Sequence, residues 1–453
     1  MSGTRIAALA GAIALAASAA HAAPAGEVTV AAVGDMTYLR PALATIERTA
    51  PALVQLIRGA DVAFGNFETS SFELKGFTGS PQIRSAGPIV LAWPGAPKEL
   101  KAMGFDIISH ANNHTFDFGS EGALATDRTL SAAGLVHAGA GPTLKAARAP
   151  HSFASGKGSV GLAAATSTFQ AAAPASDAYG PIPAHPGVNA LRTTRVIKLD
   201  PEGLEALRKL AAASPGNTED IGGAPGNGVR FQGLNFDAAP RGAGVSYAFQ
   251  MNPADEAEII DSVKAGKTAN RLMLFSLHTH EPVTDMLEPA DFTVNLAHEV
   301  IDAGANGFLG HGAHQLRGIE IYKGKPIFYS LGNFAVMLPT PGLNPGGFPL
   351  KVENGKVVAT TAVGGRPGTE SLFTQRAYFE SVIAVMRYAG DKLVEVRLHP
   401  FELAVTGDPA THGLPRPVSA EAGRVIIMRL QALSKPFGTV IAMDGDVGVI
   451  RVN

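Results

Sequence analysis

The chain has 453 residues, no cysteine and a formal net charge of −2 at pH 7. Hydrophobic residues make up 46% of it and charged residues 17%, which is typical of a well-buried globular protein and excludes a disordered one. The near-neutral charge indicates no general affinity for nucleic acid or anionic lipid, and the lack of cysteine excludes disulfides and thiolate metal sites.

The N-terminus is typical of an export signal. Arg5 forms a short basic region, the apolar run 6–20 is short for a bilayer span, and Ala20-His21-Ala22 fits a cleavage site. We therefore predict a signal peptide at 1–22 and a mature chain at 23–453, exported to the periplasm or the extracellular space. An uncleaved membrane anchor is the alternative. Later apolar runs are interrupted by Gly, Pro or charges, so we expect no stable membrane span after signal removal.

Short apolar runs recur along the chain, and most of them lead into polar residues. Such runs suit strands buried on both faces. They lie at 28–33, 61–64, 105–109, 159–165, 271–277 and 307–309. Helical patterns fall between them at 41–58, 120–133 and 291–303, and Pro51 is expected to break the first. Alternating strands and helices predict an α/β fold.

Two later regions depart from this alternation. Gly, Pro, Ala and Asn dominate residues 168–250, which we interpret as an inserted loop or small subdomain beside the functional site, with a passive surface insertion as the alternative. From about residue 318 the sequence favours antiparallel pairing. Hairpins are predicted at 319–329, 379–398 and 439–452, and one helix is predicted at 419–433.

Five of the predicted strands end in residues able to bind a metal ion. In α/β folds, ligands collect outside the carboxyl ends of the strands. A lone Gly-Asp is more often a turn, but five such endings together are hard to explain as turns. They are Asp35, Asn66 with Glu68, Asn112-Asn113-His114 with Asp117, His278 with His280 and Glu281, and His311 with His314.

The donor types in these endings indicate the chemistry. Carboxylate, amide and imidazole groups together suit a borderline divalent ion such as Zn, Mn or Fe, and a shared carboxylate can bridge two ions. His114, beside the candidate ligand Asn113, is placed to donate a proton to a leaving group. Asp117 either orients His114 or starts the following helix, and the sequence leaves both readings open.

Several motifs resemble the CapA family, which is associated with capsule and poly-γ-glutamate synthesis and is similar to calcineurin-like metallophosphoesterases. The motifs are "GDMTYLR", "VAFGNFET", "DIISHANNHTFDFG", "GHGAHQLRGIEIYKGKPIFYSLGNF" and "GTVIAMDGDVGVI". The resemblance covers about residues 28–170 and 270–450. It implies a four-layer α/β/β/α metallophosphoesterase-like sandwich with a two-metal cleft at the strand ends.

The resemblance also assigns roles to individual residues. His114 matches the proton-donating histidine of the metallophosphoesterases, with Asp117 as its candidate catalytic partner. Glu68 takes the place of the bridging aspartate. The implied metal ligands are Asp35, Glu68, Asn113, His278, His311 and His314.

Three motifs depart from the family patterns. The first reads Asp35-Met36-Thr37 instead of Asp-x-His, so one ion loses a histidine ligand. The fourth reads His278-Thr279-His280 instead of His-Trp-Gly, and His280 either supplies the missing imidazole or faces away. The last pair is His-x-x-His, so His314 could miss the metal. These changes put full two-metal occupancy in question.

We therefore expect an exported metal-dependent hydrolase that uses two divalent ions (Mn, Zn or Fe) on a phosphoester or γ-glutamyl amide. The alternatives are a non-catalytic accessory subunit that binds the polymer, and a peptide-modifying enzyme that abstracts a proton from carbon. Expected partners are an anionic polymer or phosphoester substrate and the capsule-synthesis machinery. Arg317 is the candidate to bind an anionic substrate, with a solvated surface role as its alternative.

Overall fold

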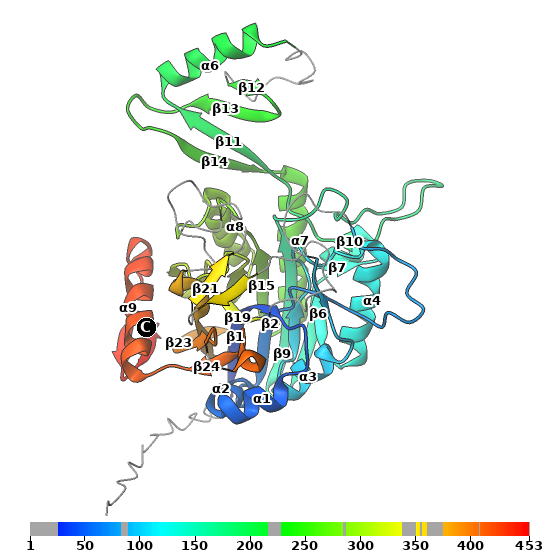
Figure 1. Cartoon of the computed structure of the whole chain (residues 1–453), viewed down its shortest axis with the longest axis vertical. Helices are drawn as coiled ribbons and strands as arrows, with labels where there is room; N and C mark the ends of the chain where they lie inside the picture. Colours follow the sequence, from blue (N-terminus) through cyan, green and yellow to red (C-terminus); the bar gives the residue numbers. More distant parts are fainter. Residues whose placement is uncertain are drawn as a thin grey trace, which may run out of the picture.

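The computed structural model describes residues 26–82, 89–215, 228–283, 287–337, 350–353, 356–359, 375–406 and 408–452. The predicted signal peptide lies outside these residues. Two sheets form the body of the molecule with helices packed around them, and a third sheet stands at one end (Figure 1). None of the helices in the described ranges is long and apolar enough to span a bilayer.

The larger sheet has ten strands in the described part of the chain, in the order β25-β26-β23-β22-β1-β2-β5-β6, with β19 beside β1 and β24 beside β23. Neighbours from β1 to β6 run parallel, so their carboxyl ends share one edge. The strands are β1 (Glu27–Thr37), β2 (Val62–Asn66), β5 (Ile107–Ser109), β6 (Val136–Ala138), β19 (Asn333–Val336), β22 (Glu380–Ala389), β23 (Lys392–Leu403), β24 (Pro415–Pro417), β25 (Ala442–Asp444) and β26 (Val447–Arg451).

The smaller sheet has six described strands in the order β17-β18-β16-β15-β9-β8. Its four central strands run parallel, and the two outer ones pair antiparallel. They are β8 (His151–Ser155), β9 (Gly158–Thr166), β15 (Leu272–His278), β16 (Gly307–His311), β17 (Ile319–Tyr322) and β18 (Lys325–Phe328). The six predicted apolar runs form strands, which confirms those predictions: they lie in β1, β2, β5, β9, β15 and β16.

Strand alternation explains why both sheets are buried on both faces. Val30 of β1 and Leu274 of β15 belong to one apolar core between the two sheets. Ala31 faces away into a core shared with the helices of the larger sheet. Met273 and Phe275 face away into a core shared with the helices of the smaller sheet. Since successive side chains point to opposite faces, continuous apolar runs fill three cores at once.

Helices cover the outer face of each sheet, which confirms the four-layer α/β/β/α sandwich. The larger sheet is covered by α1 (Leu43–Thr49), α2 (Pro51–Arg58) and α3 (Ala96–Met103), and the smaller one by α7 (Pro253–Ala269) and α8 (Asp291–Asp302). The predicted break falls at Pro51, the first residue of α2. The other helices are α4 (Gly119–Ala132), α5 (Leu144–Arg148), α9 (Ala420–Ser434) and the short η3 (Arg376–Phe379), η4 (Pro409–Thr411) and η5 (Lys435–Phe437).

Residues 168–250 contain more regular structure than their composition suggests. Most of it is a separate four-stranded sheet in the order β12-β13-β11-β14, which we call the inserted sheet; it packs against α6 through Leu204, Ala211 and Val229 (Figure 1). Its elements are β11 (Thr193–Leu199), α6 (Pro201–Ala213), β12 (Val229–Phe231), β13 (Leu234–Ala238) and β14 (Ser246–Met251). Three two-stranded pairs complete the described strands: β3 (Ser70–Ser71) with β4 (Leu91–Ala92), β7 (Ala140–Gly141) with β10 (Gly187–Val188), and β20 (Leu350–Glu353) with β21 (Lys356–Ala359).

Candidate metal centre

The carboxyl ends of the parallel strands bring the predicted ligands together. In the smaller sheet, His278 at the end of β15 lies in register with His311 at the end of β16. In the larger sheet, Asp35 of β1 lies in register with Asn66 at the end of β2. The two sheets face each other, so these pairs meet at one edge of the sandwich, as expected for an α/β ligand site.

Close backbone contacts fix Asp35 at this edge. A Cβ atom on Gly34 would lie 1.9 Å from the backbone oxygen of Gly332, so only glycine fits there. This close approach lets the backbone N–H of Asp35 donate to the same oxygen at 2.9 Å. On the opposite side, the N–H of Gly312, whose φ is +97°, donates to Asp35 Oδ2 at 2.8 Å.

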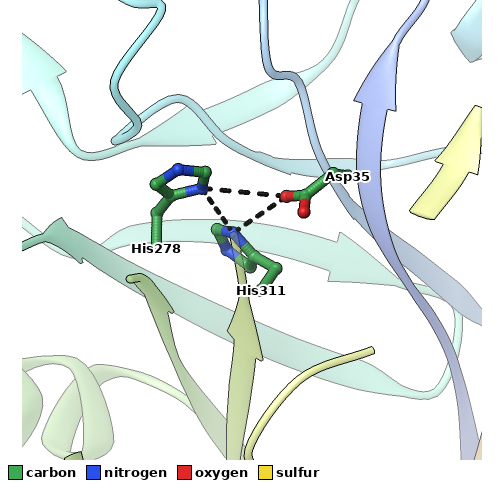
Figure 2. Close-up of side chains that lie close together, drawn as sticks. All are labelled: Asp35, His278 and His311. Atoms are coloured by element: carbon green, nitrogen blue, oxygen red, sulfur yellow. Dashed lines mark hydrogen bonds and ion pairs between the residues drawn. The ribbon is translucent and has the colours of Figure 1, made fainter. Parts of the chain in front are cut away.

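Asp35, His278 and His311 form what we call the inner cluster (Figure 2), and all three are fully buried. Asp35 Oδ1 lies 3.3 Å from His311 Nδ1 and 3.7 Å from His278 Nδ1, and the two ring nitrogens are 3.1 Å apart. Outer contacts hold these groups in place. Ser276 Oγ lies 2.7 Å from His311 Nε2, and Asn66 Nδ2 donates to Asp35 Oδ1 at 2.8 Å.

Glu68, His280 and His314 form the outer cluster. Glu68 is fully buried, whereas the two histidines are partly exposed. His314 Nε2 lies 3.7 Å from Glu68 Oε1, and its Nδ1 lies 3.0 Å from Asn333 Oδ1. His314 has a φ of +57°, a left-handed conformation that costs a non-glycine residue on the order of 1 kcal/mol.

His278 connects the two clusters. Its Nδ1 faces the inner cluster, and its Nε2 lies 3.1 Å from His280 Nε2 and 3.7 Å from Glu68 Oε1. Asp35 also reaches both clusters, because its Oδ2 lies 3.4 Å from His314 Nδ1. The clusters therefore form one continuous polar centre.

Charge and burial set the proton states in the inner cluster. Burial raises the pKa of Asp35, but hydrogen bonds to His278, His311 and His314 outweigh it and hold this pKa well below its ordinary value. Burial lowers the pKa of His278 to about 4, against the attraction of Asp35. At neutral pH, therefore, Asp35 is ionised and His278 is neutral.

The two histidines of the outer cluster are shifted in opposite directions. Burial, followed by repulsion from His278 and His314, holds the pKa of His280 well below its ordinary value. Burial also lowers the pKa of His314, but Glu68 and Asp35 outweigh it and raise the pKa to about 9. His314 therefore carries a proton at pH 7 that it must release before it can bind a metal.

The donor chemistry of each cluster fits a divalent cation. Each cluster supplies one carboxylate and two imidazoles, and in each the ligand atoms lie within 4.8 Å of one another. Oxygen and imidazole donors together suit Zn, Mn or Fe. An ionised Asp35 and a neutral His278 are already in the protonation states that metal binding requires.

The Asn112-Asn113-His114 turn adjoins this centre. Asn112 Oδ1 accepts the backbone N–H of His114 at 3.0 Å, and Asn112 Nδ2 donates to Asn66 Oδ1 at 3.1 Å. Asn66 in turn donates to Asp35. Asn112 therefore ties the turn to the inner cluster, whereas Asn113, which is partly exposed, stays a predicted ligand.

Asp117 contacts the ring of His114. Its Oδ2 lies 2.7 Å from His114 Nδ1 and accepts the backbone N–H of Val90 at 2.8 Å, while its Oδ1 accepts Gln170 Nε2 at 3.2 Å. The cap position of α4 is Phe118, and no side chain caps that helix. Of the two readings left open by the sequence, the geometry favours the one in which Asp117 orients His114.

Arg317 does not lie where a substrate contact was predicted. It is fully buried, and its guanidinium donates to the backbone oxygens of Glu281 at 2.9 Å and Val283 at 3.2 Å. Both predicted roles, substrate contact and solvated surface, need an accessible side chain. The geometry instead supports a structural role in fixing the turn after β15.

Three further groups lie in the centre beyond the predicted ligand set. The sequence left the direction of His280 open, and its ring turns toward His278. Asn333 Oδ1 lies 3.0 Å from His314 Nδ1, and Asn333 Nδ2 donates to the backbone oxygen of His314 at 2.9 Å. Asn66 bonds Asp35. Asn66 was already among the strand endings able to bind a metal ion, whereas Asn333 begins β19, and its sequence signal is its place directly after Gly332.

Comparison with known proteins identifies the family. Residues 8–337 match the family model described as bacterial capsule synthesis protein PGA_cap. An uncharacterized protein of Sinorhizobium fredii, y4sH, is 38% identical over 440 residues, which cover 94% of this chain and 93% of that protein. The PGA biosynthesis protein CapA of Bacillus subtilis is 34% identical over 113 residues, 24% of this chain and 28% of that protein.

Solved structures offer a weaker likeness. A crystal structure described as a novel phosphatase of Mycoplasma pneumoniae covers 83% of this chain and 93% of its own, with 11% identity and a TM-score of 0.37. Likeness this low carries no argument about activity. The family match, by contrast, extends over both clusters, and it confirms the resemblance to CapA: the chain belongs to the PGA_cap family of bacterial capsule synthesis proteins.

Proposed function

We propose that this protein is an exported metal-dependent hydrolase of capsule or poly-γ-glutamate metabolism, which cleaves a phosphoester or a γ-glutamyl amide. One observation carries the proposal: an oriented His114–Asp117 pair lies beside two clusters of metal-binding side chains. Family membership supports the capsule context, and the signal-like N-terminus supports export. The proposed partners are an anionic polymer or phosphoester substrate and the capsule-synthesis machinery.

The two clusters would each hold one divalent cation, with Asn113 as a further ligand. When bound, such ions polarise a phosphoryl or acyl oxygen and lower the pKa of water. The donors of the inner cluster are fully buried, whereas the partly exposed histidines of the outer cluster would leave room for a substrate.

His114 would supply the proton that the leaving group needs. Asp117 holds its Nδ1, so the opposite nitrogen, Nε2, is the one that exchanges a proton with the substrate. Repulsion from His114 is among the causes that lower the pKa of His280, after burial and repulsion from His278 and His314. A leaving oxygen or nitrogen next to the outer cluster would therefore lie near the proton donor.

Replacing His114 by glutamine tests this function. The protein would be assayed with Mn or Zn on bis-p-nitrophenyl phosphate and on γ-glutamyl-p-nitroanilide. We expect His114→Gln to lower kcat about 100-fold, the usual contribution of a positioned acid, with metal content unchanged. His298→Gln is the matched control, since His298 pairs with Glu320 outside both clusters.

Two outcomes would overturn the assignment. Normal turnover by His114→Gln would show that His114 is not the acid. A metal-loaded parent protein that cleaves neither substrate class, but still binds an anionic polymer, would favour the non-catalytic accessory role.

A further inference from the structure

A cavity of about 460 Å³ lies at the base of the inserted sheet, a volume within the range typical of small-ligand sites. Its wall comes from three segments: the loop after β9, the ends of β11 and β14, and the turn after β15. The residues that matter for its chemistry are Ser167, Arg192, Arg195, Phe249 and Glu281. None of them belongs to the metal clusters.

The cavity wall is connected directly to the metal centre. The backbone N–H of Ser167 donates to the backbone oxygen of His278 at 3.0 Å. The backbone N–H of His280 donates to Thr168 Oγ1 at 2.9 Å, and Glu281 is the next residue in the chain. A molecule in the cavity would therefore lie beside the backbone that carries two of the histidines.

Two of the charges in the cavity already have partners. Arg192 makes two hydrogen bonds to the carboxylate of Asp255, at 2.7 and 2.8 Å. Glu281 Oε2 accepts the hydroxyls of Ser167 at 2.8 Å and Thr168 at 2.9 Å, and buried Arg317 adds a favourable charge nearby. These contacts reduce the attraction of Arg192 for an anion and the repulsion that Glu281 would exert on one.

Arg195 is different. Its side chain is exposed, and its guanidinium lies over the ring of Tyr247, 5.3 Å from the centroid. In the described part of the chain no carboxylate lies within ion-pair distance of it. Stacking uses the face of the guanidinium and leaves its N–H edge for a planar or tetrahedral anion.

We propose that this cavity is an anion-binding subsite, in which Arg195 holds a carboxylate or phosphate group of the substrate that is remote from the bond to be cleaved. The position of that bond at the outer cluster rests on the proposed function. The substrate would then carry at least two anionic groups, as an acidic oligomer does, with one at the metal centre and the other in the cavity.

Direct binding tests the subsite without relying on turnover. Isothermal titration of the purified full chain would use a hexaglutamate peptide and, separately, inorganic tripolyphosphate. We expect Arg195→Ala to weaken binding of one probe about tenfold or more, as for loss of a charge-assisted hydrogen bond, and the probe affected identifies carboxylate or phosphate. Arg241→Ala should change neither affinity, because Arg241 lies between β13 and β14, outside the cavity, and pairs with Glu202.

The possible failures are distinguishable. The subsite is wrong if the parent binds neither probe, if Arg195→Ala binds both like the parent, or if Arg241→Ala weakens binding equally. If His114→Gln turns over normally while Arg195→Ala has lost affinity, the subsite stands and the proposed acid role of His114 fails.

Discussion

The inner and outer clusters each combine one carboxylate with two imidazoles, but in different settings. In the inner cluster all three side chains are fully buried, and Ser276 and Asn66 add hydrogen bonds from strands. In the outer cluster both histidines are partly exposed. Because buried ligands that are held by further hydrogen bonds move little, we infer that the inner cluster would hold its ion tightly. The partly exposed outer cluster would face the substrate.

The backbone explains this difference. His278 and His311 occupy the last positions of two paired parallel strands, so sheet hydrogen bonds fix them. Glu68 and His280 lie just past strand ends, and His314 adopts a left-handed conformation in a turn. The inner cluster is thus a product of the sheet, whereas the outer cluster depends on turns that a few side-chain contacts hold.

Asp35→Asn should impair both clusters together, since Asp35 contacts both of them. The amide keeps the shape but loses the charge that balances the histidines. We expect metal content to fall in both clusters and kcat/KM to drop by more than about 100-fold, beyond the loss typical of an outer partner. Mass spectrometry of the metals would measure it, with the exposed Asp444→Asn as control. Unchanged metal content would show that Asp35 is not a ligand.

His311→Gln and His314→Gln should separate the two clusters. In the metal-free protein, His311→Gln disturbs the buried contact with Ser276, and we expect it to lower the free energy of unfolding by about 1–3 kcal/mol. At a pH above the His314 pKa of about 9, His314→Gln alters a neutral, partly exposed group, so we expect less than about 1 kcal/mol there. Each variant should lose one equivalent of metal. Urea unfolding after chelation would measure the difference, and equal destabilisation would contradict the contrast between the clusters.

Proton release should distinguish the clusters more subtly. At pH 7 the pKa of about 9 leaves His314 protonated, while the pKa of about 4 leaves His278 neutral. Binding to the outer cluster must then expel about one proton, and its affinity should rise about tenfold per pH unit up to pH 9. Titration calorimetry in buffers of different ionisation enthalpy would count the protons. No proton release for either ion would contradict the assignment of His314 as a ligand.

The same pKa shifts determine how the stability of the metal-free protein changes with pH. Because the pKa of His314 is raised on folding, its protonated form stabilises the fold fully below pH 6.5, and this contribution is lost as the pH rises through about 9. The pKa of His278 is lowered, so its contribution is present above pH 6.5 and is lost as the pH falls toward 4. Unfolding free energies of chelated protein across this range should therefore peak between the two limits.

The parts of the fold that sequence could predict are those with strong periodicity. The apolar runs of β1, β15 and β16 specify doubly buried strands, and their polar ends specify the inner cluster. The inserted sheet was not predicted because its strands, such as β11 (TTRVIKL), mix polar and apolar residues and face a small core. Helix α7 was also missed, although Asn252 and Pro253 form a capped start, because its apolar positions are few.

The outer cluster shows where sequence patterns fail. Strand alternation could not place His280, because β15 ends at His278 and the N–H of Thr279 then bonds the backbone oxygen of His311. The turn redirects the next ring back toward His278. Arg317 was misassigned because closeness to His314 in the chain says nothing about burial. Turns, unlike strands, carry no period from which side-chain direction can be predicted.

Metal stoichiometry decides whether two separate cation sites exist. Chelated protein would be re-equilibrated with Mn or Zn, freed of unbound ion, and measured by mass spectrometry. Two clusters with complete donor sets predict two equivalents per chain in the parent and one in His314→Gln. One equivalent or none in the parent would contradict two cation sites, and with them the hydrolase proposed here.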